Sequence, residues 1–381
     1  MRQVDTLIIG GGIAGLSAAA RLARHGETVV LEAESQPGYH ASGRSVTFCH
    51  FGLGDGLVKA LTAVSRETFA APISEGETPV AHRHPALHIA RADQAAEVDA
   101  LEKVHRALSP DYHRLSGKEA AKIVPLRTGG EAATAFALLD PNGFKLDPHA
   151  MLQRHIAALR EAGGTLVTDA RATAIRRDGG RWVVDTMDES YATTRLINAA
   201  GAWADQVAAM AGVAPIGIEP RRRTVISFNG PGDTDVSAWP FTKTIGEGFY
   251  FLPEGTDRLL ASPQDETVSE PCDASPEEID IATIAWRIEE ATTMTVPRIA
   301  HRWAGLRSFA PDERPVVGYD PDAPGFFWLA GQGGFGLQTS PALSLAAEAL
   351  AMELEWPENL KRGGIGMQDL EPKRLRERRS A

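Results

Sequence analysis

Thr6-Leu-Ile-Ile9, followed by Gly10-Gly-Gly-Ile-Ala-Gly15, is the stretch of sequence that decides the fold. A helix-like segment runs from there to His25, where Gly26 can end it, and Thr28-Val-Val-Leu31 is a second apolar run. An apolar run, a glycine turn, a helix and another apolar run predict a strand–helix–strand unit with two buried strands.

The glycine spacing in this unit is typical of a dinucleotide site. Gly10 permits a tight turn, Gly12 lets the backbone approach a pyrophosphate, and Gly15 lets helix and strand pack closely. The start of the helix offers unpaired N–H groups and a partial positive charge to phosphates. Glu32, at the end of the second run, can accept hydrogen bonds from ribose hydroxyls and would repel the 2′-phosphate of NADP. The pattern predicts FAD or NAD, although a glycine-rich packing turn would look similar.

Composition narrows the class of protein. At 381 residues, with 43% hydrophobic and 23% charged residues, the chain is long enough for two globular units of roughly 150 residues or more. The net charge of −11 argues against a nucleic-acid partner. Neither a signal peptide nor a transmembrane segment is expected, so the predicted location is the cytoplasm. The sequence gives no indication of the oligomeric state.

Metal binding is not expected. Cys49 and Cys272 are far apart in sequence, and Pro85 interrupts the histidines at 82, 84 and 88. A basic cluster at 373–379 is expected to be a solvated tail.

The rest of the chain mixes helices and strands. Helices are predicted after Ser116, which forms a capping box with Glu119, from Asp147-Pro148 to Gly163, and from Ser275 to about Thr292. Strands are predicted at 165–167, 181–185, 224–228, 249–252 and 326–330, and a further helix at 340–353.

Four ordered motifs carry a resemblance to a known family. They are the segment Asp5–Glu32, Gly38-Tyr-His-Ala-Ser-Gly-Arg-Ser45, Leu196-Ile-Asn-Ala-Ala-Gly-Ala-Trp203 and Gly331-Gln-Gly-Gly-Phe-Gly-Leu-Gln-Thr-Ser340. Together they resemble the D-amino-acid oxidase superfamily of FAD-dependent oxidoreductases, and within it the enzymes like D-arginine dehydrogenase. The resemblance implies an α/β fold: a Rossmann-type FAD-binding domain (1–82, 145–217 and 308–381) with an inserted strand-rich α+β substrate-binding domain (83–144 and 218–307).

The resemblance also implies noncovalent FAD, because no cysteine lies near the segment 305–311, where some relatives attach the flavin. A helix start behind the flavin ring would stabilise the negative charge that appears on reduction. The cofactor-binding residues predicted from the glycine motif and the resemblance are Gly10, Gly12, Ile13, Ala14, Gly15, Glu32, Ala33, Gly43, Arg44, Ser45, Ala172, Ala200, Gly201, Trp203, Gly331, Gly333, Gly334, Gly336, Gln338 and Thr339.

For the substrate, the resemblance implies that Arg223 and Arg307 grip a carboxylate, with help from the Tyr250 hydroxyl, and that the Gly334 carbonyl receives the amino group. A planar guanidinium binds a carboxylate through two parallel hydrogen bonds, which orients the α-carbon. On a strand, Arg222 would point away from its two arginine neighbours. His50 is the nearest titratable candidate, although a packed histidine would look the same.

The predicted reaction is oxidation of a D-amino acid to its imino acid, by hydride transfer from the α-carbon to flavin N5, and hydrolysis of the imine to a keto acid. Three residues depart from the D-arginine dehydrogenase pattern: Phe48 replaces a pocket histidine, Leu53 a tyrosine and Ala86 a glutamate. A neutral or apolar substrate is therefore predicted over D-arginine, whose guanidinium would be left unpaired. The electron acceptor (oxygen, a quinone or another carrier) is not specified by the sequence.

Three alternatives remain open at this stage. One is oxidation of an N-substituted glycine or a cyclic imino acid, of the sarcosine or hydroxyproline type. Another is a noncatalytic flavin-binding subunit of a complex. The third is an NAD-linked dehydrogenase.

Overall fold

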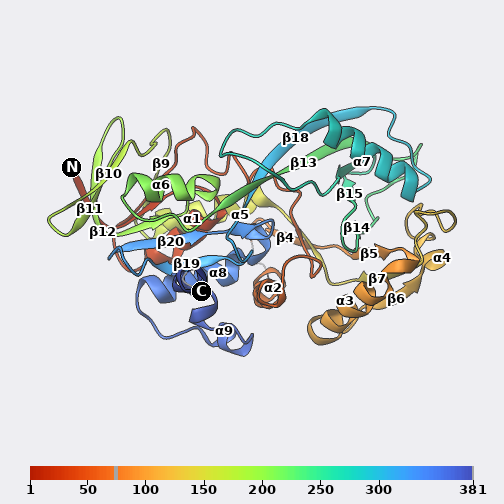
Figure 1. Ribbon diagram of the computed structural model, residues 1–381, viewed down its shortest axis with the longest axis horizontal. Coiled ribbons are helices and arrows are strands. Elements are labelled where there is room, and N and C mark those ends of the chain that lie inside the picture. The colour runs from red at the N-terminus through yellow and green to blue at the C-terminus, as the bar shows by residue number, and fades with distance from the viewer. Residues whose placement is uncertain (73–75, 380–381) are drawn as a thin grey trace.

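Two large sheets lie side by side in the computed structural model, which describes residues 1–72 and 76–379 (Figure 1). Within these residues the first sheet has eight strands. They are β1 (Arg2–Ile9), β2 (Thr28–Leu31), β9 (Thr165–Val167), β10 (Ala174–Asp178), β11 (Arg181–Asp185), β12 (Ser190–Asn198), β19 (Val316–Tyr319) and β20 (Phe326–Ala330). Its parallel centre runs in the order β9-β2-β1-β12-β20, and the remaining strands pair antiparallel.

Successive side chains of β1 point to opposite faces of this sheet and join two separate hydrophobic cores. Ile8 packs on the face that carries α1 (Ile13–Leu22), α5 (Pro148–Glu161) and α8 (Gly336–Ala351). Leu7 and Ile9 pack on the other face, with α6 (Ala204–Met210). A strand buried on both faces is what a parallel sheet requires, and it explains the uninterrupted apolar run.

The second sheet has ten strands among the described residues, in the order β21-β18-β13-β16-β15-β14-β5-β7-β6, with β17 pairing on β13. Their bounds are β5 (Ala86–Ala90), β6 (His113–Ser116), β7 (Phe136–Asp140), β13 (Glu219–Asn229), β14 (Phe241–Thr244), β15 (Tyr250–Glu254), β16 (Arg258–Ser262), β17 (Thr267–Val268), β18 (Ile299–Phe309) and β21 (Gln332–Gly333). β14 and β5 are parallel, and the other pairs are antiparallel.

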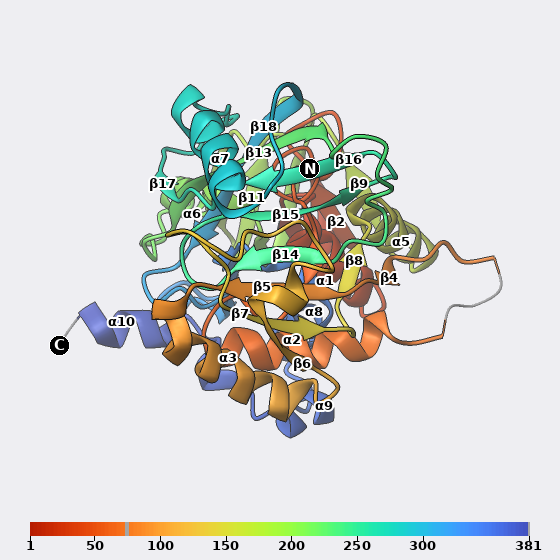
Figure 2. The same ribbon diagram turned by 90° about the vertical axis from the view of Figure 1, so that its right-hand side faces the viewer.

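Helix α7 (Glu278–Ala291) covers one face of the second sheet, where Phe249 and Phe251 join its core (Figure 2). Tyr250 and Leu252 alternate with them and pack on the opposite face, with Phe48 and Phe241. This opposite face looks toward the carboxyl ends of β1 and β12, so both sheets contribute to the space between them.

The remaining elements complete the molecule. A small sheet is formed by β3 (Phe48–Cys49), β8 (Phe144–Leu146) and β4 (Ala81–Arg83), and the other helices are α2 (Gly56–Phe69), α3 (Ala95–Leu108), α4 (Gly117–Ala120), α9 (Glu358–Arg362) and α10 (Lys373–Arg379). No helix of the described residues is long and apolar enough to cross a bilayer.

The predicted α/β fold class is confirmed, and so are the helix starts predicted at Ser116 and Asp147, whereas the helices predicted from Ser275 and Ser340 begin at Glu278 and Gly336. Ser116 forms its capping box with Glu119, and the Asp147 carboxylate accepts the Ala150 N–H at the start of α5. The predicted solvated tail is wrong within the described residues: α10 docks through the buried Leu375, and the Arg374 guanidinium binds Asp312.

The predicted domain boundaries remain a prediction. The segments expected to form the substrate-binding domain supply most of the ten-stranded sheet. Strand β21 also pairs with this sheet although it belongs to the segment expected to bind FAD. Strand β18 runs across the expected boundary at 307.

Candidate functional site

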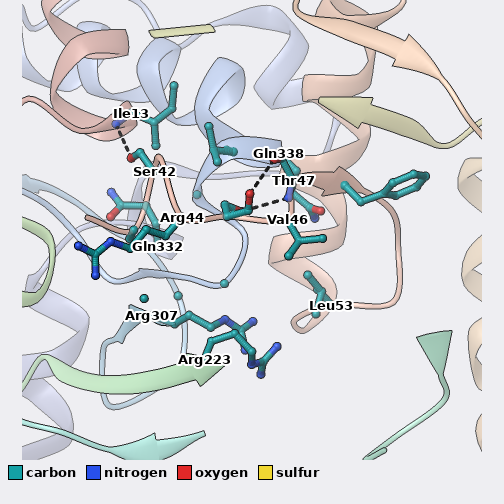
Figure 3. Close-up of a pocket in the computed structure, with 18 of the residues that line it drawn as sticks. Ile13, Ser42, Arg44, Val46, Thr47, Leu53, Arg223, Arg307, Gln332 and Gln338 are labelled. Atoms are coloured by element: carbon teal, nitrogen blue, oxygen red, sulfur yellow. Dashed lines mark hydrogen bonds between the residues drawn. The ribbon is translucent and has the colours of Figure 1, made fainter. Parts of the chain in front are cut away.

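Two cavities lie between the sheets and meet each other. The first cavity extends toward the second sheet and has Lys243 in its wall. Arg223 and Arg307 also line it (Figure 3). The second cavity extends past Glu32 and Trp203. Both are lined by Gly12, Ala41, Ser42, Arg44, Ala199, Gly201, Gly305 and Leu306, so they form one elongated space.

The start of α1 lies where the cavities meet. Gly10 has a φ of +113°, and a Cβ there would lie 2.3 Å from the Ala199 carbonyl oxygen. A Cβ on Gly15 would lie 2.0 Å from the Gly10 carbonyl oxygen, so both positions require glycine. The N–H groups of the first helical turn have no partner within the helix, and one of them, that of Ile13, donates to Ser42 Oγ at 2.9 Å.

Glu32 is fixed in the wall of the second cavity. Its carboxylate accepts the backbone N–H groups of Gly11 and Glu34 at 2.8 and 2.9 Å, and the residue is buried. Each carboxylate oxygen can accept more than one hydrogen bond, so acceptor capacity remains for the hydroxyls of a ribose.

Most of the predicted cofactor residues line these cavities. Ile13, Ala14, Ser45, Gly333, Gly334, Gly336 and Gln338 line the first cavity. Gly10, Glu32, Ala33, Ala172, Ala200 and Trp203 line the second. Gly12, Arg44 and Gly201 line both.

Four predicted cofactor residues line neither cavity and have structural roles instead. Gly15 packs α1 on β1, and Gly43 donates its N–H to the Gly38 carbonyl at 2.7 Å. Gly331 forms a turn with a φ of +73°. The Thr339 hydroxyl is buried and donates to the Phe335 carbonyl at 2.8 Å within α8. A motif residue can thus be required by the turn without facing the ligand.

The predicted alternation of the arginines on β13 is confirmed. Arg222 points to the α7 side, where it pairs with Glu277 and Asp280. Arg223 and Arg307 both line the first cavity, and Figure 3 shows their side chains next to each other. In the pairing of β13 with β18, Arg223 lies opposite Gly305. Because glycine has no side chain, nothing on β18 at this position stands between Arg223 and the cavity.

Both guanidinium groups contact one carboxylate. Glu266 Oε1 lies 2.6 Å from Arg307 Nη1 and 3.1 Å from Arg223 Nη2. Burial and then the neighbouring charge of Arg223 lower the pKa of Arg307 to about 10, although Glu266 raises it in part. Arg307 remains a cation at neutral pH, and it is poorly solvated.

Three residues of neighbouring strands form a row on the cavity face of the second sheet. Lys243 on β14 lies opposite Tyr250 on β15 and opposite His88 on β5. Tyr250 and Lys243 line the first cavity, whereas His88 lies behind it and contacts His50. Tyr250 is therefore brought to the arginines as predicted, and Lys243 is brought there with it.

His50 lines the first cavity, but its hydrogen bonds leave it no nitrogen that could act as a base. Its Nδ1 accepts the N–H of Gly52 at 3.0 Å and lies 3.2 Å from His88 Nε2. The neutral ring must then carry its proton on Nε2, so neither nitrogen is free to accept another. Burial lowers the pKa of His50 well below its ordinary value, and Lys243 lowers it further. His50 is a packed, neutral histidine in this arrangement.

Sequence reasoning missed several cavity residues, chiefly Ser42, Phe241, Lys243 and Gln332, and it missed Glu266, which contacts the arginines without lining the cavity. A signal for Lys243 existed: Phe241, Lys243 and Ile245 alternate along one strand, so a lysine shares the face of two apolar residues. The contact of Glu266 with the arginines had no such signal, because it depends on how the chain returns after β16.

The residues present fit a flavin dinucleotide. Gln332 Nε2 is buried and has no hydrogen-bond partner among the described residues, and Gln332 lines the first cavity beside the start of α8. A buried amide donor of this kind matches a ring carbonyl of a ligand. Gln332 lies at one end of the elongated space, the start of α1 in the middle and Glu32 at the other end. In this order, the three groups match the ring, the phosphates and the ribose of the dinucleotide.

Comparisons with known proteins agree with this geometry. Residues 5–350 match the model of the family described as FAD dependent oxidoreductase. Mouse mitochondrial dimethylglycine dehydrogenase is 26% identical over 368 residues, which cover 88% of this chain and 41% of that protein. The chain thus spans about two fifths of the length of this relative.

Among solved structures, L-proline dehydrogenase from P. horikoshii has a TM-score of 0.82 at 20% identity, covering 99% of this chain and 98% of that one. Iminodiacetate oxidase from Chelativorans sp. BNC1 has a TM-score of 0.74 at 23% identity, covering 94% and 98%. Both likenesses establish the fold.

Proposed function

The chain belongs to the FAD-dependent oxidoreductase family, and from that premise we propose that it oxidises the α-carbon–nitrogen bond of an amino acid, with a D-amino acid as substrate. FAD is its cofactor. Glu32 and the start of α1, which the sequence predicted, and Gln332, which it did not, are the groups that would hold it noncovalently. When bound, FAD supplies the acceptor for the hydride that leaves the substrate.

One observation carries the proposal: a single carboxylate oxygen, that of Glu266, already contacts the guanidinium groups of both Arg223 and Arg307. A substrate carboxylate could be held in the same way, with its α-carbon directed along the cavity toward Gln332 and Gly334. Fixing a reacting atom between two rigid donors removes much of the entropic barrier to the reaction.

The remaining residues handle the amino group. Gly334 offers a carbonyl that can accept an amine N–H, and Tyr250 offers a hydroxyl. Loss of hydride from the α-carbon requires the amine lone pair, so the substrate ammonium must first lose a proton. The positive charges of Arg223, Lys243 and Arg307 lower the pKa of a bound ammonium, and hence no side-chain base is required for this step.

A second candidate, oxidation of an N-substituted glycine, is supported by the likeness to dimethylglycine dehydrogenase and iminodiacetate oxidase. Such a substrate presents the same carboxylate and carries a secondary or tertiary amine. The finer resemblance to D-arginine dehydrogenase and the cytoplasmic location remain predictions.

The test is anaerobic absorbance spectroscopy of the purified yellow protein with D-amino acids, their L-enantiomers and N-methylated glycines. We expect D-amino acids to bleach the flavin. Bleaching by N-methylated glycines only would select the second candidate. A flavin that stays oxidised with every amine would contradict both and favour a noncatalytic subunit.

A matched variant is Arg307→Lys, which keeps the charge and loses the planar fork. It should slow bleaching by about 10- to 100-fold while the flavin content is unchanged.

A further inference from the structure

Lys243 is a buried amine with no acidic partner among the described residues. It is only 5% exposed, and its Nζ donates to the Thr244 carbonyl at 3.1 Å and to the Gln264 side-chain oxygen. No ion pair to Lys243 occurs among the described residues, although burying an ammonium without a counterion costs several kcal/mol. Its role is not explained by packing, because a lysine in an apolar strand face destabilises the fold.

The other charges of the first cavity do have partners. Arg44 pairs with Asp273, Arg223 with Asp265 and Glu266, and Arg307 with Glu266. The residues that line this cavity include no aspartate or glutamate within the described chain. Lys243 is thus the one lysine or arginine of this wall for which the described residues supply no carboxylate, and a ligand anion would supply the counterion that keeps it charged.

The place of Lys243 separates it from the arginine pair. Strands β16 and β15 lie between β13 and β14, so the backbones that carry Arg223 and Lys243 are about 14 Å apart at a usual strand spacing. Long side chains extend from both strands into the same cavity. A ligand that fills the space between them would meet guanidinium groups at one end and an ammonium at the other.

We propose that Lys243 binds a second carboxylate of the substrate, so that the preferred substrates are amino acids or secondary amines with two acidic groups. The proposal rests on the function proposed above and names its substrate class. It replaces the sequence-based prediction of a neutral or apolar substrate, which was drawn from Phe48, Leu53 and Ala86 and did not include Lys243. D-Arginine remains disfavoured, now by charge repulsion as well.

The balance of the reaction is that of the proposed function. The α-carbon loses a hydride to FAD, the nitrogen loses a proton, and the C–N single bond becomes an imine that water hydrolyses. The second carboxylate takes no part in these bonds and contributes only binding and orientation.

The experiment compares pairs of ligands that differ in one charge. D-Glutamate and D-glutamine have the same shape, and we expect kcat/KM for anaerobic flavin reduction to be at least tenfold higher for D-glutamate. In Lys243→Met this preference should fall by about 10- to 100-fold, the value of a charge-assisted hydrogen bond. Lys103→Met, the same change on an exposed lysine of α3, should keep the preference.

A binding measurement separates this proposal from the function on which it rests. Glutarate and pentanoate can be titrated against the oxidised protein, with the flavin absorbance as the readout. Tighter binding of glutarate, lost in Lys243→Met, is the expected result. Equal binding of the two acids, or equal reduction by D-glutamate and D-glutamine, would overturn the lysine site and leave amino-acid oxidation standing. Glutarate preference without reduction by any amine would overturn the proposed function instead.

Discussion

Gly334 leaves no room for a side chain beside Arg307. A Cβ at this position would lie 1.5 Å from Arg307 Nη2, far below any contact distance. Gly334→Ala must therefore push the guanidinium out of the position in which it can grip a carboxylate. We expect kcat/KM for the best substrate to fall by about 100-fold, since a displacement near 1 Å has effects of that size.

Steady-state kinetics and flavin content check this expectation together. Gly129→Ala is the matched control, because a Cβ at that position meets no atom within 4 Å. Full activity of Gly334→Ala would mean that Arg307 moves freely and does not position the substrate.

Lys243 makes a second residue-scale prediction, on stability. Burial lowers its pKa from 10.5 to about 7, and the charges of Arg223 and Arg307 contribute. Between these two pH values the unfolded chain holds a proton that the folded chain has lost, so the contribution of this group to stability rises with pH across that window. Below pH 7 the lysine is charged in the folded protein as well as in the unfolded chain, so the cost of burying its charge lowers the stability most.

Lys243→Met should therefore stabilise the substrate-free protein by about 1–4 kcal/mol at pH 6, and by less at pH 9. Chemical denaturation at the two pH values measures the difference. Other titrating or charged groups that face Lys243 are unchanged in the variant: Arg223, Arg307, Glu266, His50, His88 and Tyr250. A variant less stable than the parent at pH 6 would show that the lysine has an anionic partner within the fold.

At the scale of elements, the segment between β16 and β17 supplies the carboxylate that contacts the arginine pair. It carries Gln264, with a φ of +58°, and Glu266, which is 42% exposed on its side chain and contacts Arg221, Arg223 and Arg307. In the absence of substrate this carboxylate occupies the guanidinium groups that the substrate would use. We therefore expect it to compete with a substrate carboxylate for these two arginines.

Glu266→Gln removes the competing charge and keeps the shape of the side chain. Glutarate and the substrate should bind about 3- to 10-fold more tightly to the variant, because the positive potential at the arginines rises. The same titration of flavin absorbance measures this change, at low and high salt. Weaker binding would assign Glu266 the opposite role, that of holding the two arginines in place.

Elements that depend on local chemistry could be predicted from the sequence. The glycine turn at Gly10, the capping box at Ser116 and the Asp147 cap each require only a few consecutive residues, and all are present. The alternation of Arg222 and Arg223 followed from strand geometry in the same way. Lys243 could not be placed, because its neighbours Tyr250 and His88 come from strands whose order and register depend on the whole sheet.

At the scale of the whole molecule, the cofactor site joins parts of the chain that are far apart in sequence. The first cavity takes lining residues from α1, from the segment 41–53, from β13 and β18, and from the start of α8. The two sheets contact each other around this space, so a bound ligand adds contacts between them. The folded state should therefore be coupled to flavin binding.

Removal of FAD should lower the thermal stability of the protein. A ligand present at about 1,000 times its Kd stabilises the folded state by about 4 kcal/mol, which for a chain of this size is roughly 5–10 °C in Tm. Differential scanning fluorimetry of the flavin-free protein, with and without added FAD, measures the shift. ADP should restore only part of it, since it can fill the second cavity beside Glu32 and leave the first empty. Equal Tm values with and without FAD would mean that the two sheets hold together without the cofactor, and that the elongated cavity is preformed.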